Sequence, residues 1–160
     1  MIRQNSAYRM RPLFNTQGAI QMKYLWIIPL SLFCIAANAQ SNFTGKDFSG
    51  VYDCTGQDNS EGTYTGKVTI GLVKEKSTGE YGAYKFKLEV PGFGAYPGHA
   101  AARDNNMAIY FANTDPSTKD FGTGIANFAK NKSGKWTFKK FYYEPEFKGG
   151  NFGIETCSAR

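Results

Sequence analysis

From residue 49 onward, the chain is a succession of short stretches in which apolar and polar residues alternate. In the stretch 81–90, Tyr84, Phe86, Leu88 and Val90 share one parity, and lysines and a glutamate occupy the other. A period of two is typical of a β-strand with one buried face. The sequence contains no helical period of useful length after the first forty residues. The pattern therefore predicts an all-β fold.

Turn-forming sequences rich in glycine, asparagine and aspartate separate these stretches at a spacing of roughly 12–15 residues. Eight strands are predicted, over 49–57, 63–76, 81–90, 95–103, 107–113, 121–130, 135–144 and 150–158. Tight connections in sequence favour an eight-stranded antiparallel up-and-down barrel, because closure removes the two exposed edges of the sheet. A two-sheet β-sandwich is the alternative that the same pattern allows.

The first 39 residues have the features of an export signal rather than of a folded domain. Lys23 precedes an apolar run of about a dozen residues, which is too short to span a bilayer as a helix, and Ala37-Asn38-Ala39 forms an A-x-A cleavage site. We expect residues 1–21 to be a non-native extension, 22–39 a signal peptide, and 40–160 a single domain. The mature protein is then periplasmic or secreted, without a membrane anchor.

Cysteine usage agrees with export. Of the three cysteines, Cys34 leaves with the signal peptide, so that Cys54 and Cys157 remain. An even number in an oxidising compartment indicates one disulfide. The two residues lie on the first and last predicted strands, which are neighbours in a closed barrel. We therefore predict a Cys54–Cys157 disulfide, with two free buried thiols as the alternative.

The charge of the mature chain argues against a nucleic-acid partner. Four of the 19 basic residues precede the cleavage site and none of the 13 acidic residues does, which leaves 15 basic residues and a net charge of +2. The remaining lysines are interspersed with acids, as on an ordinary solvated surface. A nucleic-acid binder would show a concentrated basic face.

The first predicted strand carries Gly50-Val51-Tyr52. With the strand count and the mature length, this segment resembles the calycins, the lipocalin-like and avidin-like barrels, which have Gly-x-Trp at this place. Tyr52 stands here instead of the tryptophan. The resemblance implies that a small ligand binds in the barrel or at its mouth. We expect the secreted protein to be a monomer.

The aromatic residues on inward positions are expected to form the core, or alternatively to line a ligand pocket. These residues are Tyr64, Tyr84, Phe86, Trp136 and Phe138.

In an up-and-down barrel, the connections after the first, third, fifth and seventh strands share one end. We predict that these connections are the longer ones and carry the functional surface, because binding residues concentrate on loops held by a rigid scaffold. The alternative is that Phe93 and Phe147 fold down and plug the barrel. The candidate ligand-binding or partner-binding residues are Phe93, Tyr96, Asp115, Lys119, Tyr142, Glu144, Glu146, Phe147 and Lys148.

No catalytic or metal-binding motif occurs in the sequence, so we expect no catalytic residue, metal or cofactor. Glu144 and Glu146 could form a glycosidase-like pair of carboxyl groups, in which one carboxyl needs a raised pKa. Pro145 and the exposed loop argue against the apolar pocket that would raise it. The segment 115–120 is interpreted as a capped turn.

Three function classes remain. The first is an exported barrel that binds a small apolar or amphipathic ligand. The second is a protein-binding barrel, such as a secreted inhibitor or surface component, that acts through the segment 142–152. The third and least favoured is a small hydrolase.

Overall fold

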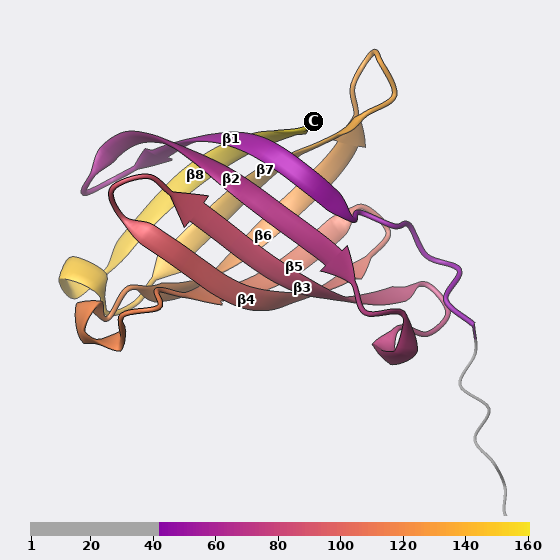
Figure 1. The fold of residues 1–160 in the computed structure, drawn as a ribbon, viewed down its shortest axis with the longest axis horizontal. Helices are drawn as coiled ribbons and strands as arrows, with labels where there is room; N and C mark the ends of the chain where they lie inside the picture. Colours follow the sequence, from indigo (N-terminus) through magenta and orange to yellow (C-terminus); the bar gives the residue numbers. More distant parts are fainter. Residues whose placement is uncertain (1–41) are drawn as a thin grey trace, which may run out of the picture. The chain divides into compact units, whose positions relative to one another are not determined.

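The computed structural model describes residues 42–160, which form a closed antiparallel barrel (Figure 1). The predicted extension, the signal peptide and the cleavage site before Gln40 lie outside the described residues. The eight strands are β1 (Gly50–Asp58), β2 (Gly62–Leu72), β3 (Tyr81–Val90), β4 (Gly94–Arg103), β5 (Asn106–Ala112), β6 (Phe121–Lys130), β7 (Trp136–Glu144) and β8 (Asn151–Ala159).

Each strand pairs with the next along the chain, and β1 also pairs with β8. This up-and-down order confirms the predicted barrel over the sandwich. Side chains on alternate positions point inward, as the pattern of β3 shows: Tyr84, Phe86, Leu88 and Val90 are all buried. The period of two in the sequence therefore fixes which face of each strand forms the interior.

The second strand is shorter than predicted. β2 ends at Leu72 instead of residue 76, and a three-residue 3-10 turn, Lys74–Lys76, follows. Continuation of the strand would turn Lys74 and Lys76 inward, and an unpaired buried ammonium group is costly. Ser77 holds the segment instead, because its hydroxyl donates to the carbonyl of Val73 and accepts from the N–H of Ala83, both at 2.9 Å.

The lengths of the connections differ from the prediction as a result. The segments 59–61 and 91–93 are minimal turns, whereas 73–80, at the end where only short turns were predicted, is as long as 113–120. None of the helices within residues 42–160 is long and apolar enough to cross a membrane.

One end of the barrel is sealed by the segment that leads into β1. Phe48 is 1% exposed and stacks on Phe128 at 4.2 Å between ring centroids, with Trp136 packed edge-on at 4.9 Å. The hydroxyl of Tyr52 donates to the carbonyl of Phe48, and that of Tyr84 donates to the carbonyl of Lys46. Aromatic packing and these two hydrogen bonds close this end of the interior.

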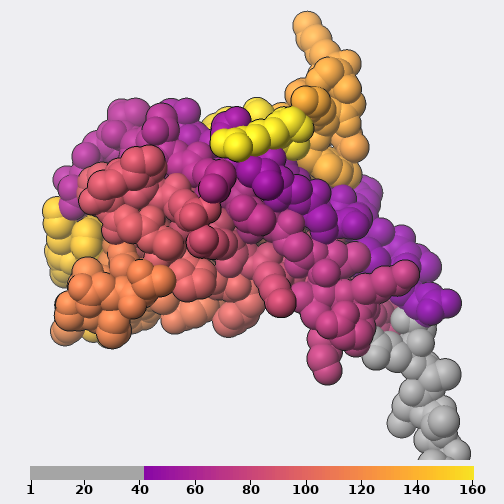
Figure 2. Space-filling model, viewed as in Figure 1, coloured from indigo at the N-terminus to yellow at the C-terminus, as the bar shows by residue number. Residues whose placement is uncertain are grey.

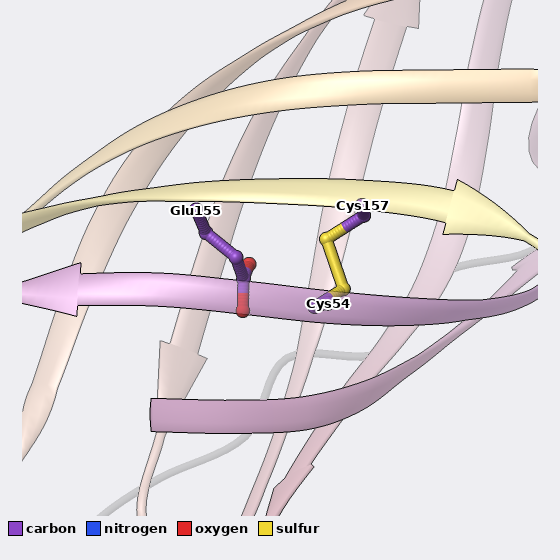
Figure 3. Close-up of side chains that lie close together, drawn as sticks. All are labelled: Cys54, Glu155 and Cys157. Atoms are coloured by element: carbon purple, nitrogen blue, oxygen red, sulfur yellow. A yellow bond between two sulfur atoms is a disulfide. The ribbon is translucent and has the colours of Figure 1, made fainter. Parts of the chain in front are cut away.

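The predicted disulfide is present at the seam of the barrel. Cys54 and Cys157 are direct partners in the β1–β8 register, with Cα atoms 4.1 Å apart. Both cysteines are buried on the inner face, and Figure 3 shows the bond running from β8 to β1 with Glu155 next to it. A buried disulfide fits an oxidising compartment.

We predict that the double variant Cys54→Ser/Cys157→Ser is less stable than the wild type by about 4–5 kcal/mol, because the bridge closes a loop of about 100 residues in the unfolded chain. Urea unfolding of both proteins without reductant measures the difference. A loss below about 1 kcal/mol would mean that strand pairing alone holds the seam.

Candidate functional site

Four connections lie together at the end opposite Phe48, as predicted. They are 59–61, 91–93, 113–120 and 145–150, and Figures 1 and 2 show the longer two side by side at this end. Side chains tie them to one another. Lys119 pairs with Glu146 at 3.5 Å, Lys148 pairs with Glu61, and the amide of Asn113 donates to the carbonyl of Phe93. We call this end the mouth of the barrel.

A cavity of about 50 Å³ lies beneath the mouth. It is large enough for a few water molecules or one small polar group, but far smaller than the roughly 300–1,000 Å³ of a pocket for a drug-sized molecule. Aromatic and charged side chains share its wall. The lining residues are Asp58, Glu61, Tyr64, Leu88, Val90, Phe93, Tyr96, Phe111, Asp120, Lys140, Tyr142, Glu144 and Phe147.

Inward-facing glycines make room for the two tyrosines that cross the interior. A Cβ atom on Gly56 would lie 2.1 Å from the ring of Tyr64, and one on Gly153 would lie 2.3 Å from the hydroxyl of Tyr142. Real Cβ contacts are never this short, so any larger residue would displace the rings. Glycine at these two inward positions thus leaves the space that the rings of Tyr64 and Tyr142 occupy.

An ion pair lies in the middle of the interior. Lys140 and Glu155 are 1% and 0% exposed, and their charged atoms are 2.6 Å apart. The ammonium group also lies 5.2–5.3 Å from the ring centroids of Phe86, Phe111 and Tyr142. The carboxylate of Glu155 accepts a hydrogen bond from the hydroxyl of Tyr64 at 3.3 Å. Charge pairing and ring faces together compensate the buried lysine.

A second group of polar side chains links Asp58 to Glu144. The hydroxyl of Tyr142 donates to Asp58 at 2.7 Å, and the amide of Asn151 donates both to Asp58 at 2.8 Å and to Glu144 at 2.7 Å. Burial alone would raise the pKa of Asp58. The hydrogen bonds from Tyr142, Asn151 and the backbone N–H groups of Ser60 and Glu61 outweigh it and hold that pKa below its usual value.

Glu144 and Asp120 form the acidic side of the cavity. Asp120 accepts a hydrogen bond from the hydroxyl of Tyr96 at 2.7 Å. Burial is the main cause that raises the pKa of Glu144 to about 7. The nearby carboxylates of Asp120 and Asp58 act in the same direction, and the hydrogen bond from Asn151 acts against them. Near neutral pH, both the protonated and the ionised form of Glu144 are therefore populated, and the charge of the cavity changes with pH.

The nine predicted site residues divide into two groups. Five of them line the cavity: Phe93, Tyr96, Tyr142, Glu144 and Phe147. The other four are exposed around the mouth: Asp115, Lys119, Glu146 and Lys148. Asp115 caps the 3-10 turn Pro116–Thr118 by accepting from the N–H and hydroxyl of Ser117, which agrees with the interpretation of this segment as a capped turn.

The expectation that no apolar pocket raises the pKa of the Glu144 and Glu146 pair is wrong for Glu144. Glu144 ends β7 and points inward, where it is 6% exposed, whereas Glu146 follows Pro145 and faces solvent. The two carboxyls lie in different environments because the strand ends between them. The acidic neighbours of Glu144 come from other strands and connections, namely Asp120 and Asp58.

Sequence reasoning missed the buried polar residues Asp58, Asp120, Lys140, Asn151 and Glu155. Parity within each strand could have found most of them. Lys140 has the parity of Phe138 and Tyr142, and Glu155 has that of Cys157. A charged residue on the inward parity of a barrel strand predicts an interior ion pair.

One group of potential metal ligands lies close together among the described residues, namely Cys54, Glu155 and Cys157 (Figure 3). Both sulfur atoms belong to the disulfide and cannot act as thiolate ligands. Glu155 is engaged by Lys140. The structure therefore gives this group a structural role at the seam.

We predict that Glu144 makes stability depend on pH. Its pKa in the folded protein is about 7, and an unfolded glutamate titrates near pH 4.3. The folded protein binds the proton more tightly, so stability falls as pH rises between these values and is level above them. The fall should be on the order of 1–3 kcal/mol, allowing for solvent screening at the mouth.

The matched variant is Glu144→Gln, which keeps an oxygen acceptor for Asn151 and cannot titrate. Urea unfolding across this pH range should show a shallower dependence for the variant than for the wild type. Asp58 does not interfere, because its lowered pKa places its titration at more acidic pH. Equal pH dependence of the two proteins would contradict the prediction.

The chain matches no family model, no curated protein and no solved structure in comparisons with known proteins. The likeness to calycins therefore rests on architecture alone, that is, on a closed eight-stranded antiparallel barrel.

Proposed function

We propose that this protein is an exported, non-catalytic barrel that binds one small amphipathic molecule at the mouth. The observation that carries the proposal is the asymmetry of the interior. Phe48 and its aromatic neighbours seal one end, whereas the other end holds a cavity in which charged groups and rings meet. An interior that served stability alone would be packed with apolar side chains. A buried polar network is costly unless every member has its hydrogen-bond partners.

The two kinds of lining residue suggest how a ligand would lie. Leu88, Val90 and Phe111 offer apolar wall in the interior, and Phe93 and Phe147 stand at the entrance. Phe93 is 47% exposed, which supports a place at the entrance over the role of a buried plug. A polar head group would occupy the cavity, and the apolar part of the ligand would cover the rings of the entrance.

Export is part of the proposal. It is supported by the signal-like segment 22–39 in the sequence and by the buried disulfide.

Protein binding is a second candidate function, favoured by Tyr143 and Phe152. These two rings flank the connection 145–150 and are 49% and 48% exposed. Exposed aromatic residues beside a loop are frequent in protein interfaces.

We predict that the double variant Phe93→Ser/Phe147→Ser stays within about 1 kcal/mol of wild-type stability, as expected for substitutions of partly exposed side chains. The same variant should lose the ligand. Native mass spectrometry of protein exported and purified from its own host measures the added mass of a bound molecule, and urea unfolding measures stability.

Tyr81→Ser is the control, because Tyr81 is 52% exposed at the sealed end. It should keep the ligand. A loss of several kcal/mol in the double variant would mean that the two phenylalanines are plugs and would refute the binding role of the mouth.

A further inference from the structure

The cavity beneath the mouth contains more acid than base. Asp58, Asp120 and Glu144 all line it, as does Glu61 at the rim. Lys140 is the only cation among the lining residues, and Glu155 already neutralises it. Glu61 is neutralised in turn by Lys148. Three interior carboxyl groups therefore remain without a cationic partner within the described residues.

One carboxylate oxygen of Asp120 lacks a hydrogen-bond donor. Its residue exposure is only 8%, and one carboxylate oxygen accepts from Tyr96. The other oxygen, Oδ1, is buried and has no hydrogen-bond partner. The carboxyl group of Glu144 lies within hydrogen-bond reach of Asp120, but it can donate only when it is protonated. A buried carboxylate oxygen without a donor is costly, so this position favours a ligand that brings N–H or O–H groups.

The spacing of the acids argues for an organic cation over a bare metal ion. Within the described residues, Cys54, Glu155 and Cys157 are the only three potential ligands with atoms within 4.8 Å of one another. Glu144 and Asp120 lie close together, but no three of the mouth carboxyls within the described residues come that close to one another. An ammonium group carries three donors that can reach separate acceptors, and aromatic faces attract it. Tyr96, Phe111 and Tyr142 supply such rings in the cavity wall.

We propose that the mouth cavity selects a protonated primary amine with an apolar body. The ammonium group donates to Asp120 Oδ1 and to the carboxyl group of Glu144, and the apolar body packs on Phe93 and Phe147 at the entrance. This assignment rests on the proposed function and adds the charge of the ligand to it. It also explains why the cavity needs little volume, because only the head group enters.

The test compares three probes of equal length: hexylamine, hexanol and hexanoate. Isothermal titration calorimetry at about pH 8, where Glu144 is ionised and the amine is still protonated, should give at least about tenfold tighter binding of hexylamine than of hexanol. Hexanoate should bind most weakly. Asp120→Asn and Glu144→Gln should each weaken hexylamine binding by about tenfold or more.

Glu80→Gln is the matched control, because it removes one exposed carboxylate at the sealed end, where Glu80 pairs with Arg103. Its affinity for hexylamine should equal that of the wild type. Equal binding of hexanol and hexylamine would overturn the amine assignment and leave small-ligand binding intact. Failure of all three probes to bind at millimolar concentration would overturn the proposed function itself.

An independent observation concerns the outer face of β5 to β8. Two rows of outward side chains run across these strands in register. One row is Ala108, Ile125, Phe141 and Ile154, and the other is Tyr110, Thr123, Tyr143 and Phe152. Neither row contains a charge, whereas the outer face of β2 and β3 carries Lys67, Lys85, Lys87 and Glu89. We call the two rows the apolar face.

The six large side chains of the apolar face are between 39% and 66% exposed. At roughly 150–250 Å² for each fully exposed large side chain, they offer on the order of 500 Å². Two copies paired through this face would bury about 1,000 Å² in total, which is the lower bound for a specific interface. A groove of about 460 Å³ runs along the face, lined by Tyr110, Ile125 and Phe141 among others. A continuous apolar patch of this size is at the upper end of what monomers expose, and such patches often bind a partner.

We infer that the apolar face pairs with the same face of a second copy, which makes the protein a dimer instead of the monomer expected from the sequence. A two-fold interface needs a self-complementary surface, and a face without charge meets its own copy without repulsion. Since the apolar face lies outside the barrel, dimerisation leaves the cavity itself unchanged.

Sedimentation equilibrium from micromolar to submillimolar concentration tests this inference. The wild type should be dimeric, Ile125→Lys should be monomeric, and the control Thr65→Lys on the outer face of β2 should stay dimeric. A monomeric wild type would overturn the inference, as would a dimeric Ile125→Lys variant. A wild-type monomer that co-sediments with vesicles of phosphatidylethanolamine and phosphatidylglycerol would assign the face to lipid instead.

Discussion

The polar half of the interior depends on the buried pair of Lys140 and Glu155. Neither charge has access to water, so each would be strongly destabilising without the other, by about 3–5 kcal/mol on removal of one partner. Glu155 also neutralises Lys140, which is the only cation among the described residues that line the cavity. The three acidic side chains of the cavity are therefore stabilised by hydrogen bonds. Tyr142 donates to Asp58, Asn151 donates to Glu144, and Tyr96 donates to Asp120. The high pKa of Glu144 follows mainly from burial, and the nearby carboxylates of Asp120 and Asp58 add to it.

The two ends of the barrel are held by different forces. Around Phe48, close-packed rings with few polar atoms give stability that depends little on pH or salt. Beneath the mouth, glycines at positions 56 and 153 give up packing volume so that Tyr64 and Tyr142 can cross the interior and reach carboxylates. A barrel of this width is normally filled by side chains. Here the sealed end supplies the core, which leaves the mouth free to hold charged groups.

The period of two in the sequence predicted the barrel and its inward aromatic residues well, because burial of one face dictates that pattern. The strand order of a closed barrel also predicted that Cys54 and Cys157 lie on neighbouring strands, and the structure shows them as direct partners. The end of β2 was predicted wrongly, because the inward parity of Lys74 was not weighed against the cost of burying it. The same neglect of parity left Lys140 and Glu155 unnoticed. The burial that chiefly raises the pKa of Glu144 could have been predicted from the parity that it shares with Tyr142. The contribution of Asp58 could not, since Asp58 lies on β1 and meets Glu144 only after the barrel closes.

Closure of the barrel also sets the order in which the chain can finish folding. Seven of the eight strand pairs join neighbours in sequence, whereas β1 pairs with β8 across a separation of 103 residues between the bridged cysteines. Loop closure over that distance costs more entropy than any hairpin, so the local pairs form first. Until β8 is available for pairing, β1 remains an open edge and Cys54 remains a thiol without its partner. The newly made chain is therefore most exposed to wrong strand pairing and to interchain disulfides just before its last nine-residue strand arrives.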